Sequence, residues 1–257
     1  WSESYDDQSE DIFQIQSSIA RDVARALQAE LTPQERQLLE TSTPVSGAAY
    51  DRYSQGILEW DRRENRASAI RAVELFREAT EIDGNFALAF AFLSQARMWL
   101  FWNFPGYQDQ AELAREALDR AQELAPNAVE TRLAQGYFFF YGRGDSEEAL
   151  RHFAAAEALK PSDAGVISAM GLLYRGQGRW DEAVEAFERA RNYDPRSYNL
   201  NHTLADTYLR MRRLAEAERY FQLAATLAPD VAAAHRELLR VRLAATGDTV
   251  AAREDIE

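Results

Sequence analysis

Cysteine is absent from this sequence of 257 residues, which excludes disulfide bonds, thiolate chemistry and the usual structural zinc sites. Histidine is scarce, and none of His152, His202 and His235 is spaced with a second histidine and a carboxylate as metal ligands are. Neither a metal site nor a cofactor is therefore predicted. No apolar run reaches the roughly 18 residues that a membrane-spanning helix needs, and the start of the chain lacks the layout of a signal peptide.

Basic residues are outnumbered by acidic ones, with 29 Lys and Arg against 42 Asp and Glu, so the formal net charge is -13. Nonspecific binding to nucleic acid or to an anionic membrane needs a basic surface. We therefore expect neither partner through this region. The first residue is Trp1 rather than Met, so we expect a fragment or a processed form whose upstream part is missing.

Glycine and proline are also few, with 12 and 7 residues. The order of small, aromatic and proline residues reveals an internal repeat. Seven residues of one stretch match, in size and polarity, seven residues that stand 34 places later. The first set is Met170, Gly171, Tyr174, Ala183, Phe187, Ala190 and Pro195, and the second is Leu204, Ala205, Tyr208, Ala217, Phe221, Ala224 and Pro229. The apolar spacing predicts a helix over about 164–175 and a second over about 181–193. Gly176 and Gly178 mark the turn between them, and Pro195 ends the second helix.

A hairpin of this kind cannot bury its apolar face alone, so stacked copies are expected. Gly171 and Ala183 are small where the two helices approach each other, and Phe187 is expected to fill the wedge toward the next unit. The unit length, with small residues at places 8, 20 and 27 and proline at the end, resembles the tetratricopeptide repeat, or TPR.

The resemblance implies an all-α fold, a right-handed α-solenoid of about five TPR hairpins with an N-terminal helical extension and a C-terminal capping helix. Residues 1–48 are the acidic lead-in and the extension. The repeats run over about 49–86, 87–128, 129–163, 164–197 and 198–231, and a partial sixth unit occupies 232–257. Repeat one has a turn about four residues longer than the family length, and in repeat two an extended connection over Trp99–Tyr107 adds about eight.

The N-terminal segment, with Trp1–Asp7 followed by a helix predicted over Ile12–Leu31, resembles the junction between a TolB-like domain and a TPR array in bacterial signalling proteins. This resemblance implies a regulatory module of a multidomain bacterial protein. We expect a cytoplasmic location rather than a periplasmic one. The resemblance would make the N-terminal helices the tail of a neighbouring domain. A plain capping helix explains the same segment equally well.

The first helices of a TPR stack line a concave groove, and in the N-terminal half their groove-facing places are mostly aromatic. These places hold Tyr50, Tyr53, Ile57, Trp60, Leu88, Gln95, Met98, Trp99, Leu133, Tyr137, Phe140 and Tyr141. The rings could anchor an apolar helix or an extended peptide, because Tyr and Trp are frequent interface anchors. Alternatively, the Trp99–Tyr107 connection or the Ile12–Leu31 helix fills the groove and buries them.

The C-terminal half of the groove is expected to be rich in arginine. Its predicted lining is Arg175, Asn199, His202, Asp206, Arg210, Arg236 and Arg240. These arginines could hold a carboxylate or a phosphorylated segment through paired hydrogen bonds. Alternatively, they lie on a solvated face, neutralised by Glu216, Glu218 or Glu237.

Nothing in the spacing of the carboxylates selects a catalytic pair, so we expect no enzyme. The leading hypothesis is a non-catalytic scaffold that binds a protein or peptide segment in the concave groove. The alternative is structural self-association into a homodimer through the Ile12–Leu31 helix or the Trp99–Tyr107 connection.

Overall fold

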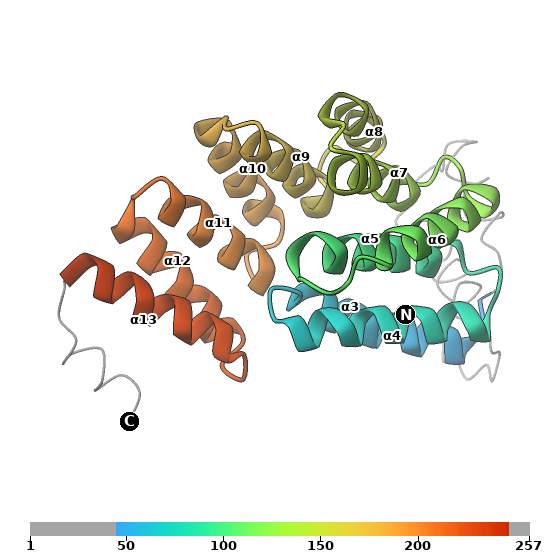
Figure 1. Cartoon of the computed structure of the whole chain (residues 1–257), viewed down its shortest axis with the longest axis horizontal. Coiled ribbons are helices and arrows are strands. Elements are labelled where there is room, and N and C mark those ends of the chain that lie inside the picture. The colour runs from blue at the N-terminus through green and yellow to red at the C-terminus, as the bar shows by residue number, and fades with distance from the viewer. Residues whose placement is uncertain (1–44, 247–257) are drawn as a thin grey trace, which may run out of the picture.

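The computed structural model describes residues 45–246. The acidic lead-in, the predicted Ile12–Leu31 helix, the TolB-like junction and residues 247–257 of the partial sixth unit lie outside these residues. Within them, the chain is a succession of antiparallel helix pairs, as Figure 1 shows. The pairs are α3 (Gly47–Asp61) with α4 (Arg66–Ile82), α5 (Ala87–Asn103) with α6 (Gln110–Leu124), α7 (Val129–Tyr137) with α8 (Ser146–Leu159), α9 (Ala164–Gly176) with α10 (Trp180–Tyr193), and α11 (Tyr198–Arg210) with α12 (Leu214–Leu227). The single helix α13 (Ala232–Thr246) follows them.

The helix boundaries follow from local chemistry. Asp145, Asp163 and Ser197 each precede a helix, and their side chains accept a hydrogen bond from a backbone N–H of its first turn. The α9–α10 turn needs a left-handed residue, which Gly178 supplies with φ 75°. Arg212 takes the equivalent place between α11 and α12 with φ 61°, so the turn keeps its shape without glycine there.

A small residue on the first helix of a pair makes room for an aromatic ring on the second. A Cβ atom added to Gly171 would lie 2.7 Å from the Phe187 ring, and one added to Gly136 would lie 2.2 Å from the Phe153 ring. Gly56 stands in the same relation to the Phe76 ring. The expectation that Phe187 fills the wedge toward the next unit was therefore incomplete, because its ring packs against Gly171 inside its own hairpin.

Two segments depart from the regular hairpin. The Trp99–Tyr107 connection was expected to be a loop, but Trp99–Asn103 continues α5 by more than a turn, so that only residues 104–109 connect α5 to α6. The apolar run of α5 makes this extension favourable, because Trp99 and Leu100 are buried in the core. The second departure is the π-helix η1 (Phe138–Arg143), which continues α7 and shifts the register of its last side chains.

The array curves until its first and fifth hairpins touch. In Figure 1 the helices follow an arc from α3 through α7 to α11, and the start of α11 returns to the end of α3. A hydrogen bond from the Tyr198 backbone N–H to Asp61 and an ion pair between Arg62 and Asp230 join segments that lie more than 130 residues apart in the sequence. The first helices of the five pairs therefore enclose a common interior.

Candidate functional site

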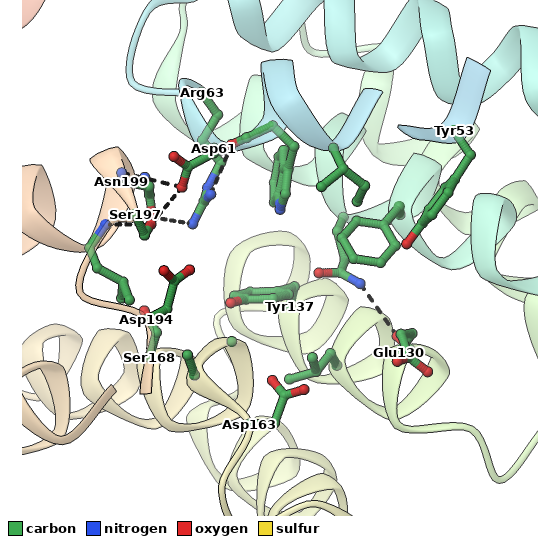
Figure 2. A pocket seen from close by; sticks show the side chains of 18 residues that line it. Tyr53, Asp61, Arg63, Glu130, Tyr137, Asp163, Ser168, Asp194, Ser197 and Asn199 are labelled. Carbon is green, nitrogen blue, oxygen red and sulfur yellow. Dashed lines mark hydrogen bonds between the residues drawn. The ribbon is translucent and has the colours of Figure 1, made fainter. Parts of the chain in front are cut away.

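The interior holds a pocket of about 480 Å³, which we call the central pocket. All five first helices contribute side chains to it, as the TPR resemblance predicts for a concave wall. Its lining comprises Tyr53, Ile57, Trp60, Asp61, Arg63, Phe92, Gln95, Glu130, Leu133, Tyr137, Asp163, Ala164, Gly165, Ser168, Asp194, Ser197, Asn199 and Leu200. Figure 2 shows the aromatic side on α3 and α7 facing a polar side that α9 and α11 supply.

The closing contact consists of the hydrogen bonds that join Asp61 and Arg63 to the start of α11. The Asp61 carboxylate accepts hydrogen bonds from the Ser197 hydroxyl at 2.5 Å and from the backbone N–H groups of Tyr198 at 2.9 Å and Asn199 at 3.4 Å. A helix N-terminus carries unpaired N–H groups and a partial positive charge, so a carboxylate is well placed there. Arg63 adds a hydrogen bond to the Asn199 side-chain oxygen.

The Arg63 guanidinium is held by aromatic rings as well as by hydrogen bonds. Its central carbon lies 4.3 Å from the centroid of the Trp60 ring and 5.1 Å from that of Trp99. It donates to the Trp60 carbonyl oxygen at 2.9 Å, and the Trp99 indole N–H donates to the Arg63 carbonyl at 3.0 Å. The inner wall thus already binds one cation between two tryptophans.

Burial is the main cause of the raised pKa values of the tyrosines in the central pocket. It raises the pKa of Tyr137 to about 12, while Arg63 opposes this shift and Asp163 reinforces it. Burial also raises the pKa of Tyr53 strongly, and Glu130 adds to that increase. Both hydroxyls therefore stay protonated at neutral pH, and they can donate or accept hydrogen bonds without carrying charge.

A second pocket of about 270 Å³, the arginine pocket, lies near the C-terminal end of the array. Its lining comprises Glu64, Trp99, Asn103, Arg175, His202, Thr203, Asp206, Arg210, Phe221, Ala233, Arg236, Glu237 and Arg240. Asp206 pairs with Arg175 at 3.2 Å and with Arg210 at 2.8 Å, and Arg240 pairs with Glu237 at 3.1 Å. Arg236 forms no ion pair with any residue in 45–246 that the structure describes.

The structure brings most of the predicted groove residues together, though in two pockets rather than one continuous wall. Tyr53, Trp60 and Tyr137 line the central pocket, and Trp99 and Tyr141 close a narrow space beside it. His202, Arg210, Arg236 and Arg240 line the arginine pocket.

Five predicted residues lie outside the part of the groove expected for them. Leu88 packs in the same apolar cluster as Tyr50, and Met98 is fully buried in the core. Tyr50 packs beside Tyr53 in a separate apolar cluster. Phe140 lies against Gly176, because the π-helix turns it away from the central pocket. Asn199 lies in the central pocket rather than among the arginines, since the closing contact holds it there.

These positions bear on the two alternatives given above. One was that another segment of the chain fills the groove, and the other was that Glu216, Glu218 or Glu237 neutralises its arginines. No residue of the Trp99–Tyr107 connection lines the central pocket, although Trp99 and Asn103 line the arginine pocket, and Trp102 is 58% exposed. The Ile12–Leu31 helix lies outside the described residues. The arginines are paired in part, but by Asp206 and Glu237. Glu216 pairs with Arg213, and Glu218 pairs with Arg242.

Sequence reasoning missed the polar side of the central pocket. Asp163 and Ser197 look like ordinary helix caps in the sequence, and Asp194 looks like the end of a helix. Asp61 and Arg63 lie at the start of the turn of repeat one that is longer than the family length. That extra length was the one signal that could have identified them.

Comparison with known proteins agrees with this geometry. Residues 174–243 match the family model described as tetratricopeptide repeat. A thermophilic TPR protein of Thermus thermophilus superposes on 76% of this chain and on all of its own length, with a TM-score of 0.59 and 20% identity. The chain has the fold of a TPR solenoid.

Human IFIT1, solved as a dimer with m7Gppp-AAAA, superposes on 94% of this chain with a TM-score of 0.62. The match covers 54% of the IFIT1 chain, and at 16% identity it supports the fold alone. A sequence relative, the putative adenylate cyclase 3 of Rhizobium meliloti, is 36% identical over 128 residues, or 46% of this chain. The matched region spans about a fifth of that relative, at 21% of its length.

No helix within residues 45–246 combines the length and the apolar character that would let it cross a membrane. The TPR fold supports a role in protein interaction in general, and it is typically non-catalytic.

Proposed function

We propose that this TPR solenoid is a non-catalytic interaction module that binds a segment of a partner protein in its interior. The observation that carries the proposal is the central pocket, to which all five first helices contribute. Its volume lies within the range of pockets that hold small ligands, so it suits one or two side chains of an extended segment. The aromatic rings of Tyr53, Trp60 and Tyr137 supply the anchors that protein interfaces favour.

The arginine pocket extends this proposal to an anionic part of the partner. Four arginines line it, and Arg236 forms no ion pair with the other described residues. The His202 side chain is 8% exposed, and its buried Nδ1 atom forms no hydrogen bond within residues 45–246. A carboxylate or phosphate of the partner would supply the acceptor oxygens that guanidinium groups bind best.

A tryptophan pair tests the binding of a partner segment. Trp60 lines the central pocket, whereas Trp102 lines neither pocket. Binding to a peptide array should fall at least about tenfold for Trp60→Ala, in the range of interface hot spots. Trp102→Ala should keep the wild-type peptide profile. Circular dichroism would confirm that both variants fold, and a Trp60→Ala variant that folds and binds the same peptides equally well would refute the proposal.

We further propose a regulatory setting for the module, as the resemblance of the N-terminal segment to a TolB-like junction implies. The Rhizobium relative supports this setting, because it is named as an adenylate cyclase and the matched region is only part of it. Sequencing the coding region upstream of Trp1 tests this idea. A domain with an output activity in the same reading frame would support it, and a start codon directly before Trp1 would overturn it.

Self-association is the second candidate, and the exposed Trp102 side chain favours it. A large exposed aromatic ring is a common part of protein interfaces. Light scattering would decide this point, because a mass that stays at the 29.2 kDa of one chain at all concentrations would exclude a dimer.

A further inference from the structure

The central pocket carries an excess of negative charge. Asp61, Glu130, Asp163 and Asp194 line it, and Arg63 is the basic residue in its lining. Asp61 is committed to the start of α11, and Arg63 to Asn199 and the Trp60 carbonyl. The other three carboxylates therefore face the pocket without a balancing cation among its lining residues.

These three carboxylates differ in how far their hydrogen-bonding capacity is used. Glu130 accepts a hydrogen bond from Lys160 at 3.2 Å, and Asp163 accepts one from the Val166 N–H at 3.1 Å at the start of α9. Asp194 accepts none through its side chain within residues 45–246. Its carboxylate is thus free to bind a ligand.

Two hydroxyl groups on largely buried side chains face the same pocket. The Tyr137 side chain is 8% exposed and Ser168 is 5% exposed, and neither hydroxyl has a hydrogen-bond partner among the described residues. Both residues line the central pocket together with Asp163 and Asp194, and Figure 2 shows the Tyr137 hydroxyl directed into the pocket. Neither oxygen is among the fully buried polar atoms that lack a partner, so both are open to the pocket and can accept hydrogen bonds from a ligand. An N–H donor in the pocket could therefore reach both hydroxyl and carboxylate oxygens.

A metal ion does not suit these carboxylates. No three His, Cys, Asp or Glu side chains in the described part of the chain converge closely enough to hold one. An organic cation fits better, because its several N–H groups reach acceptors that lie apart, and its face packs on aromatic rings. Arg63 already provides a local example, since its guanidinium lies over the Trp60 ring of the same wall.

We propose that the side of the central pocket formed by Tyr137, Ser168, Asp163 and Asp194 binds a basic side chain, arginine or lysine, of the partner segment. This inference rests on the proposed function and defines its specificity. The two pockets together select a segment that carries a basic residue and an acidic or phosphorylated residue. The closing contact lies between the two pockets, because its Asn199 lines the central pocket and donates a hydrogen bond to Glu64, which lines the arginine pocket.

Small probes test the basic specificity without knowledge of the partner. We would titrate the whole chain with N-acetyl arginine amide, N-acetyl lysine amide and N-acetyl norleucine amide, and follow binding by saturation-transfer NMR. The two basic amides should bind, and the uncharged norleucine amide should bind at least about tenfold more weakly, as expected for the loss of a charge-assisted hydrogen bond. A norleucine amide that binds as tightly as the lysine amide would overturn the inference.

A matched pair of charge variants locates the effect. Asp194→Asn removes one negative charge from the pocket, and Glu185→Gln removes one from the exposed face of α10, where Glu185 forms no hydrogen bond or ion pair with another described residue. Asp194 is exposed, so Asp194→Asn should weaken the arginine amide about three- to fivefold, and Glu185→Gln by less than about twofold. Equal weakening by both variants would show a long-range charge effect and contradict a built site.

The outcome also separates the two proposals. If peptides bind through Trp60 on the array but the basic amides do not bind, the inference about the basic side chain fails and the interaction module stands. If the basic amides bind in an Asp194-dependent manner but no peptide binds, the pocket assignment stands and the proposed function fails.

Discussion

Replacing Asp61 with asparagine should loosen the contact that closes the solenoid. The carboxylate accepts three hydrogen bonds, from the Ser197 hydroxyl and from two N–H groups at the start of α11. Asparagine keeps one oxygen acceptor but removes the negative charge, so the charge-assisted part of these bonds and the interaction with the helix dipole are lost. We expect a loss of about 2 kcal/mol in the free energy of unfolding.

For a chain of this size, that loss corresponds to a decrease of roughly 4–8 °C in Tm. Calorimetry would measure the decrease, and hydrogen exchange would locate it, because the Tyr198 amide should exchange faster than the amides in the middle of α11. Asp51→Asn is the control, since Asp51 lies exposed on the same helix and forms no hydrogen bond or ion pair with another described residue.

Two results would refute this reasoning. The first is an equal Tm for Asp61→Asn and Asp51→Asn. The second is unchanged exchange of the Tyr198 amide, which would show that the start of α11 is held without the Asp61 charge.

Two further predictions concern packing and pH. Gly136→Ala should lower the free energy of unfolding by about 1–3 kcal/mol in denaturant titrations, because the new Cβ would overlap the Phe153 ring. Gly84→Ala, where nothing lies within 4 Å of the new atom, should be neutral or slightly stabilising, and equal effects would contradict the packing account. The pKa of Tyr137 is raised from 10.0 to about 12, so its contribution to stability should be complete below pH 10 and lost as the pH rises through 12. Tyr137→Phe should therefore flatten the dependence of Tm on pH in that range, and an unchanged slope would contradict the assignment.

The regular part of the fold was predictable because each unit packs its two helices against each other in the same way. The 34-residue stride, with proline at its end and a small residue opposite an aromatic ring, predicts where helices stop and how closely they pack. Helices 164–175 and 181–193 were expected, and Ala164–Gly176 and Trp180–Tyr193 are observed. The same reasoning correctly assigned the first helices to the inner wall.

The irregular parts were not predictable from the repeat. The apolar run after Met98 is compatible with a loop or with a longer helix, and only its burial against neighbouring helices decides for the helix. The π-helix after Tyr137 depends on the packing of several consecutive aromatic residues, and it moves Phe140 away from the pocket. The polar side of the central pocket depends on contact between the ends of the array, which no local pattern encodes.

The hydrogen bond between Asp61 and Ser197 fixes how many hairpins fit between α3 and α11. An open solenoid tolerates the gain or loss of a hairpin, because each unit contacts only its neighbours. Here an inserted hairpin would push the two ends apart and separate the aromatic side of the central pocket from its carboxylates. The length of the array is therefore part of its specificity, and a change in repeat number would alter what it binds even if every individual repeat still folded.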